Sequence, residues 1–409
     1  MRVREERAEG ATGMLVGHPI FWIMAAAVLA PLLGEIPVGF KVPVVVLEVV
    51  LGILIGPHVL NLVQFDGFVV TMFTIGMAAT LLIAGMELDF SEIKGRPLML
   101  AAGGWITSVL MGITAVGLLH VIPQVRAPLM VTLAMCTTGL GVLIPIYRDS
   151  DQLRTALGRF VLACGTIGEI GPIIAMSLLL SGHYSTWQEA GYLLAFLLIV
   201  AIAIAIGVAA RPPRILELLS RHMHKSTQLP LRLSMLMLAA LLLLAGRFGF
   251  DRILGAFAGG MILGQATRGE SGKTLREKME TISFGWFYPF FFVGTGIKFN
   301  INALGKDLTT MLLVPTFALL FLIVRGTPVL LYRGHIGTAQ RLPFALSSAV
   351  PSLSIVVVIT EIGVRAKSMN PDVAAAMIGA ALLSVLLFST IAGSIVSRTA
   401  LPPPGRNPA

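Results

Sequence analysis

The chain has 409 residues, of which 56% are hydrophobic and 12% charged, and its mean hydropathy is +0.87. This composition excludes a soluble domain and indicates an integral membrane protein, for which we expect no enzymatic activity and no cofactor. The net charge of +9 could suggest a nucleic-acid partner, but the basic residues lie in short loops between apolar runs, where they orient a membrane protein. We therefore expect the lipid bilayer, and no nucleic acid, as a partner.

Apolar segments long enough to cross about 30 Å of hydrocarbon follow one another along the chain. We predict an all-α polytopic protein of about thirteen transmembrane helices, at 18–33, 42–61, 68–86, 96–122, 127–146, 156–181, 188–211, 231–247, 252–267, 282–301, 307–333, 341–363 and 372–397. A tail at 1–17 precedes this membrane domain of 18–397, and a short tail at 398–409 follows it. The loops after odd-numbered spans are the richest in Lys and Arg, which predicts an inner-membrane protein with its N-terminus outside and its C-terminus in the cytoplasm.

Two of these spans carry helix-breaking and hydroxyl residues at their middles. They are Thr137, Thr138, Gly139, Gly141 and Pro145 in the fifth span, and Ser347, Ser348, Pro351, Ser352 and Ser354 in the twelfth. Proline removes a helix hydrogen bond, and hydroxyl groups can satisfy the backbone groups that it frees. Each feature alone could be a simple kink. Interrupted helices at corresponding positions of two halves instead indicate the central binding site of a transporter.

The order of the spans supports the second interpretation. Spans 4–6 and 11–13 each have an interrupted helix in the middle, and corresponding spans of the two groups are offset by seven, an odd number. The second group therefore crosses the membrane in the opposite sense to the first, as in an inverted repeat. We predict that the two interrupted helices cross each other.

One acid is the only charged residue of the apolar stretch 160–181, and one base is the only charged residue of the stretch 308–331, in the spans next to the interrupted helices. Glu169 is at the midpoint of span 156–181, and Arg325 is inside span 307–333. Charges at membrane depth are costly and mark ion or proton pathways by default. A buried carboxylate binds a proton or a cation because burial penalises its empty ionised form. A permanent structural ion pair between the two residues is the alternative.

Four stretches, taken in order, resemble a known transporter family. VPVVVLEVVLGILIGP (42–57), TIGMAATLLIAGMELD (74–89), ILGAFAGGMILG (253–264) and PFFFVGTGIKF (289–299) are similar to signature stretches of the second monovalent cation:proton antiporter family. That family includes Kef-type potassium efflux systems and NapA-type sodium/proton antiporters. The resemblance implies a homodimer and an NhaA/NapA-like fold. In that fold, core transport helices, here about 96–181 and 307–397, move like an elevator against a dimerisation scaffold.

The resemblance also assigns roles, with two departures from the family pattern. Glu169 takes the place of the ion-binding acid, but Gly168 stands where the first residue of an acidic or amide pair is usual. Arg325 stands where the family's later basic residue, usually Lys, is found. Kef-type proteins also carry a cytosolic nucleotide-binding regulatory domain, for which this chain shows no sequence.

One carboxylate needs help from neutral oxygens to bind an alkali cation. Hydroxyl residues at the interrupted helices and beside Glu169 are candidate ligands: Thr137, Thr138, Thr166, Ser347 and Ser348. Arg325 cannot carry a proton through a transport cycle, because a guanidinium essentially never loses one. We therefore predict a counter-charge role for Arg325 that contacts Glu169 in only part of the cycle. No metal site beyond the transported cation is expected.

Two further charged residues in spans are secondary candidates. For Glu48 we expect a structural hydrogen bond to a neighbouring helix, with a transport role as the alternative. Lys298 follows the aromatic run WFYPFFF, which indicates an interface anchor, with a position facing the core as the alternative.

The predicted function is exchange of Na⁺ or K⁺ for H⁺, with one cation for one proton and no net charge moved. A second candidate is a proton-coupled transporter of an anionic or organic solute with the same architecture. Gly168 favours that candidate, because losing a negative charge suits anions. A third is a channel-like or sensory protein that has lost exchange.

Overall fold

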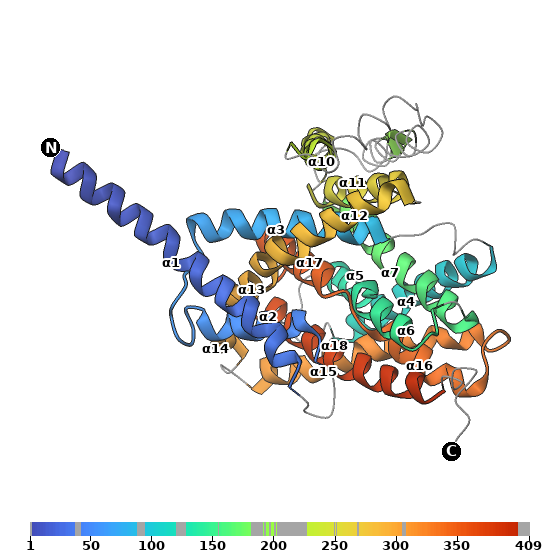
Figure 1. Ribbon diagram of the computed structural model, residues 1–409. Helices are drawn as coiled ribbons and strands as arrows, with labels where there is room; N and C mark the ends of the chain where they lie inside the picture. The colour runs from blue at the N-terminus through green and yellow to red at the C-terminus, as the bar shows by residue number, and fades with distance from the viewer. Residues whose placement is uncertain are drawn as a thin grey trace, which may run out of the picture. The chain divides into compact units, whose positions relative to one another are not determined.

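The computed structural model describes residues 2–36, 42–87, 95–119, 128–153, 155–180, 227–248, 252–267, 270–304 and 308–399, with isolated positions at Phe250 and between 191 and 202. The chain divides into two compact units. Unit 1 contains Met1–Val38, Val44–Asp89 and Ile173–Asn302, and unit 2 contains Gly39–Pro43, Phe90–Pro172 and Ala303–Ala409. The secondary-structure elements among the described residues of both units are helices (Figure 1).

Unit 1 is built from helices that approach each other closely through glycine. Its elements are α1 (Arg2–Gly34), α2 (Val44–Ile55), α3 (Gly67–Glu87), α10 (Leu229–Arg247), α11 (Arg252–Ala266), α12 (Glu270–Ile282), the π-helical η1 (Ser283–Phe287), α13 (Tyr288–Lys298) and α14 (Ile301–Leu304). Helix α3 packs on α11, and α2 packs on α13. A Cβ atom on Gly260 of α11 would lie 2.0 Å from the carbonyl oxygen of Leu82, and one on Gly52 would lie 2.2 Å from that of Val293. These pairs of backbones touch, so no side chain fits between them.

Unit 2 contains both interrupted helices and the helices that surround them. Its elements are α4 (Arg96–Leu119), α5 (Pro128–Met135), α6 (Leu140–Asp149), α7 (Ala156–Leu180, in this unit as far as Pro172), α15 (Leu308–Gly326), the 3-10 helix η2 (Thr327–Tyr332), α16 (Thr338–Ala349), α17 (Leu353–Arg365) and α18 (Pro371–Thr399). Helix α18 packs along α15, α16 and α17, and α4 packs on α5, α15 and η2.

The predicted spans largely correspond to helices. Each one except 188–211 coincides with a helix or with two consecutive helices, and 188–211 lies almost entirely outside the described residues. Among the described residues, seven helical segments are long and apolar enough to cross a membrane: Gly67–Glu87, Arg96–Leu118, Ala156–Met176, Leu229–Arg247, Leu308–Tyr332, Thr338–Arg365 and Pro371–Val396. The prediction of an all-helical polytopic architecture is confirmed.

Two helical regions fall where the sequence predicts none. Helix α1 begins at Arg2, so the segment predicted as a tail at 1–17 is helical from its second residue. Helix α12 occupies a segment predicted as a loop. It is a charged helix in which Arg276 and Glu280 form an ion pair of 3.1 Å while Met279 is buried. A search for apolar runs misses such a helix, because only one of its faces is apolar.

Both predicted interruptions are present. The first separates α5 from α6 at residues 136–139, and the second separates α16 from α17 at residues 350–352 (Figure 1, teal and orange). Gly139, Val350 and Ser352 have extended backbone conformations, with ψ angles of 100°, 109° and 99°. Pro351 lies in the second break, whereas Pro145 lies within α6.

Candidate functional site

The two breaks lie directly against each other. The N–H group of Gly139 donates a hydrogen bond of 2.9 Å to the carbonyl oxygen of Val350, and the N–H group of Ser352 donates one of 3.3 Å to Oγ1 of Thr137. A Cβ atom on Gly139 would lie 2.8 Å from the carbonyl oxygen of Pro351, so this close approach requires glycine. Each break thus satisfies backbone groups that the other leaves without a helical partner.

Glu169 meets the first break from α7. Its side chain is buried, with 3% of its surface exposed, and Oε1 accepts a hydrogen bond of 3.0 Å from the N–H group of Leu140. Leu140 is the first residue of α6, so the carboxylate lies at the N-terminus of a half-helix. Free N–H groups and the helix dipole both favour a negative charge there. Beside it, the carbonyl oxygen of Gly168 accepts a bond of 3.2 Å from the N–H group of Thr138.

Arg325 reaches the same break from α15 and is 1% exposed. Its Nε and Nη2 atoms donate to Oγ1 of Thr138 at 2.9 and 2.5 Å. Nη2 also lies 3.2 Å from the carbonyl oxygen and 3.1 Å from Sγ of Cys164, and Nη1 lies 3.4 Å from Oγ of Ser108. All of these acceptors are neutral. In this conformation the guanidinium is therefore held by groups of α4, α7 and the break, and not by the Glu169 carboxylate.

Thr138 connects this guanidinium to the second interrupted helix. While its hydroxyl accepts from Arg325, it donates a hydrogen bond of 2.7 Å to the carbonyl oxygen of Ser348. Ser348 lies in the last turn of α16, where helix carbonyl groups point out and the dipole is negative. The positive charge of Arg325 is thus placed close to the C-terminal end of a half-helix, which stabilises it.

Gly168 explains one departure from the family pattern. A Cβ atom at this position would lie 2.8 Å from Nη2 of Arg325, and 2.8 and 2.9 Å from Cβ and Oγ1 of Thr138. The guanidinium and the threonine therefore occupy the space that a side chain at position 168 would need. A carboxylate there and the present arrangement of Arg325 exclude each other.

Most of the candidate neutral ligands are hydrogen-bonded within the breaks. Thr137 donates to the carbonyl oxygen of Ala134 at 2.8 Å, and Ser348 donates to that of Phe344 at 2.8 Å. The hydroxyl group of Ser347 lies 2.9 Å from that of Tyr147. Together with the bonds of Thr138, these contacts give each of the four hydroxyl groups a structural partner.

Thr166 differs from the other candidates. It is buried, with 3% of its surface exposed, and its hydroxyl has no hydrogen-bond partner among the described residues. It lies three residues before Glu169 on α7, so the two side chains share one face of the helix. This distinguishes Thr166 from the four candidates whose hydroxyl groups are hydrogen-bonded within the breaks.

Three contributors to this region were missed from the sequence. Ser108 donates to the carbonyl oxygen of Val324 at 2.9 Å and also contacts Arg325. Cys164 accepts from Arg325 through both its sulfur and its carbonyl oxygen. The indole Nε1 of Trp105 donates to the carbonyl oxygen of Cys136, the first residue of the first break, at 3.2 Å. The sequence did contain one signal for Cys164. It lies one helical turn before Gly168 on α7, so both residues lie on the same side of that helix.

The secondary candidates, Glu48 and Lys298, both lie in unit 1. Glu48 on α2 is buried, with 6% of its surface exposed, and the structural hydrogen bond predicted for it is absent among the described residues. Lys298 ends α13, is exposed, and places Nζ 5.5 Å from the centre of the Phe65 ring. This distance corresponds to a cation–π contact, and the role of Lys298 as an interface anchor stays a prediction.

Comparison with known proteins gives concordant matches. A family model described as "Sodium/hydrogen exchanger, transmembrane" matches residues 24–398. The putative Na(+)/H(+) antiporter YjbQ of Bacillus subtilis (strain 168) is 24% identical over 380 residues, which cover 88% of this chain and 60% of YjbQ. The Na(+)/H(+)-K(+) antiporter GerN of Bacillus cereus is 25% identical over 315 residues, which cover 73% of this chain and 77% of GerN. This chain therefore spans less than two thirds of the length of YjbQ.

One solved structure shows the same fold. The sodium proton antiporter MjNhaP1 from Methanocaldococcus jannaschii, determined at pH 8, matches with a TM-score of 0.62 and 18% sequence identity. The match covers 94% of this chain and 99% of that one.

Proposed function

Because the chain belongs to the sodium/hydrogen exchanger transmembrane family, whose members are multi-pass membrane transporters, we propose that it exchanges Na⁺ or K⁺ for H⁺. The observation that carries this proposal is the buried carboxylate of Glu169, which is bonded to the N-terminus of a half-helix beside two breaks that meet. Such a carboxylate binds either a proton or a cation, because each neutralises the same charge. Competition between the two is the basis of exchange.

The binding site we propose consists of Glu169, the Thr166 hydroxyl and backbone carbonyl groups at the breaks. Thr166 supplies a neutral oxygen from the same helix face, and alkali cations accept such oxygens. Thr137, Thr138, Ser347 and Ser348 then shape the breaks through their own hydrogen bonds. Glu48 and Lys298 have no part in this site.

Arg325 acts as a fixed positive charge in this proposal. It cannot release its proton, so Glu169 is the single group that titrates during exchange. One cation then replaces one proton, and the cycle moves no net charge. Exchange measured with the membrane potential clamped tests this stoichiometry: a current that rises with the exchange rate contradicts it.

The exchange movement we propose is an elevator-like displacement of unit 2 in a homodimer. The residues of the proposed site all belong to unit 2, which contains Phe90–Pro172 and Ala303–Ala409. The predicted transport helices, 96–181 and 307–397, lie largely in the same parts of the chain. The distribution of Lys and Arg supports an N-terminus outside and a C-terminus in the cytoplasm.

The purified protein in proteoliposomes tests the function. Addition of Na⁺, K⁺ or Li⁺ on one side should drive protons out, which a trapped pH-sensitive dye reports. Glu169→Gln should reduce this signal to that of protein-free liposomes, because an amide binds neither a proton nor a cation in this way. Glu280→Gln is the matched control, since Glu280 is half exposed on α12 and paired with Arg276, a type of contact that contributes little. Equal exchange by Glu169→Gln and the parent would show that the site is elsewhere.

Transport of an anionic solute is less well supported. Such a solute would need the guanidinium of Arg325, whose donors are already bonded to Thr138, Cys164 and Ser108. Organic anions in the same liposome assay separate the two functions.

A further inference from the structure

Helix α6 is held at both of its ends by single hydrogen bonds to other helices. At its start, the N–H group of Leu140 donates to Glu169 on α7. In its last turn, the hydroxyl group of Tyr147 lies 2.9 Å from that of Ser347 on α16. The two contacts are about 10 Å apart along the axis, at 1.5 Å per residue. Tyr147 is 1% exposed, so its hydroxyl is bonded away from solvent.

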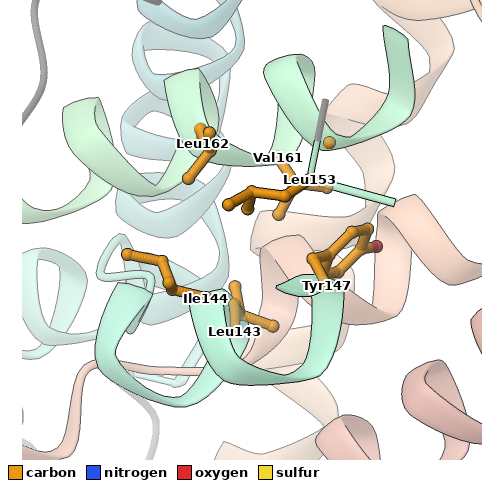
Figure 2. Close-up of a pocket in the computed structure, with 7 residues that line it drawn as sticks. Leu143, Ile144, Tyr147, Leu153, Val161 and Leu162 are labelled. Carbon is orange, nitrogen blue, oxygen red and sulfur yellow. The ribbon is translucent and has the colours of Figure 1, made fainter. Parts of the chain in front are cut away.

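The side of α6 that faces α7 carries apolar residues. The pocket between the two helices is lined by Leu143, Ile144, Tyr147, Leu153, Gly158, Val161 and Leu162, and it has no room for a water molecule. Figure 2 shows six of these residues, with Leu143, Ile144 and Tyr147 on α6 and Val161 and Leu162 on α7. Apolar contacts have no preferred direction, whereas hydrogen bonds do. The hydrogen bonds at the two ends of α6 therefore add a directional constraint to this packing.

We propose that Tyr147 is a positioning residue for the cation site: its hydrogen bond to Ser347 holds α6 in the orientation that directs the Leu140 N–H group at Glu169. The ten-residue α6 is a short rigid rod, because its backbone hydrogen bonds connect every turn. A shift of its Tyr147 end therefore tilts its other end, where Leu140 meets the carboxylate. Ser347 acts through Tyr147 and not as a ligand.

This inference rests on the proposed exchange function. It predicts that removing the hydrogen bond weakens cation binding more than it slows the maximal rate of exchange. Glu169 with a correctly placed N–H donor is better prepared to hold a cation in its ionised form. A typical net contribution of one hydrogen bond corresponds to about a fivefold change in affinity. The apparent KM for Na⁺ should therefore rise by about that factor when the bond is removed, while the maximal rate stays within about twofold.

The experiment compares Tyr147→Phe, Ser347→Ala and the double variant in proteoliposomes. Tyr147→Phe keeps the ring and removes only the hydroxyl, so it leaves the packing in place. Each single variant should raise the apparent KM, and the double variant should be no worse than either, because both remove the same bond. The shift in unfolding temperature caused by Na⁺ provides a second readout, and it should shrink at equal Na⁺ concentration.

Two results would overturn the inference. One is a Tyr147→Phe variant with the KM and the Na⁺-induced shift of the parent. The other is a KM raised by Ser347→Ala alone, which would make Ser347 a direct ligand. If Tyr147→Phe fails to fold, the KM of the Ser347→Ala variant, in which Tyr147 is unchanged, decides the question. An unchanged KM in that variant contradicts the inference. A parent protein that shows no exchange contradicts the proposed function, whereas these results in an active parent contradict the role of Tyr147 alone.

Discussion

Helices contact each other by different means in the two units. In unit 1, α3 meets α11 and α2 meets α13 through glycines, with backbone against backbone. In unit 2, α5, α6, α16 and α17 meet through hydroxyl groups, exposed backbone groups and two buried charges. Glycine contacts have one close-packed arrangement, whereas a polar network can exchange partners. We therefore expect unit 1 to be the more rigid unit, and the proposed ion site lies in unit 2.

The largest expected effect tests the rigidity of unit 1. Gly260→Ala places a methyl group 2.0 Å from the carbonyl oxygen of Leu82, so α3 and α11 must separate. We expect a loss of about 3 kcal/mol, the upper end for overpacking, measured as thermal unfolding in detergent. Gly259→Ala is the control, because the nearest atoms to its methyl group lie at 3.4 Å. Equal stability of the two variants would contradict a backbone contact at Gly260.

The next effect concerns the network of unit 2. Thr138→Val removes the acceptor of Nε in Arg325 and the donor to Ser348. A buried charged donor without its partner costs about 2–3 kcal/mol, so unfolding temperature and exchange should both fall. Thr74→Val is a suitable control, since the Thr74 hydroxyl is exposed and bonds only within its own helix. A stable and fully active Thr138→Val variant would show that Arg325 does not depend on this hydroxyl.

A smaller effect is expected at Gly168, where the guanidinium of Arg325 occupies the space that a side chain would fill. Gly168→Ala puts a methyl group 2.8 Å from Nη2 of Arg325 and displaces the guanidinium. We expect about 1–2 kcal/mol of lost stability and a roughly tenfold lower exchange rate. In contrast, Gly141→Ala in α6 meets no atom within 4 Å and should stabilise the helix by about 0.5–1 kcal/mol. If Gly168→Ala behaves like Gly141→Ala, the guanidinium is not confined as described.

The smallest effect separates a ligand from a structural hydroxyl. Thr166→Val keeps the side-chain shape but removes an oxygen that has no hydrogen-bond partner among the described residues. Stability should therefore be unchanged within about 0.5 kcal/mol, while the apparent KM for Na⁺ rises roughly fivefold. Thermal unfolding and the liposome assay measure the two quantities. A stability loss without a KM change would remove Thr166 from the site.

The sequence predicted the features that depend on local composition. Apolar runs predicted the helices, and glycine, proline and hydroxyl residues around Gly139 and Pro351 predicted both breaks. Helix α12 escaped, because its i,i+4 charge pair and single apolar face resemble a loop when only hydropathy is considered.

Features that depend on distances between helices were beyond the sequence. At position 168 the sequence showed only that the usual carboxylate or amide is missing. Its physical meaning came from Arg325 on a helix far along the chain, because Nη2 would lie 2.8 Å from a Cβ atom at that position. The same holds for Tyr147 and Ser347, which are 200 residues apart. The hydrogen bond predicted for Glu48 required a partner that no helix provides among the described residues.

Trp105 gives the site an optical label. Its indole donates a hydrogen bond to the carbonyl oxygen of Cys136 in the first break, and its ring occupies the space beside Gly171, two residues after Glu169. Indole fluorescence responds to the polarity and mobility around the ring. A rearrangement of the break on cation binding would therefore change the emission of a residue already in place, and replacing the other tryptophans with phenylalanine would isolate that signal without an added dye.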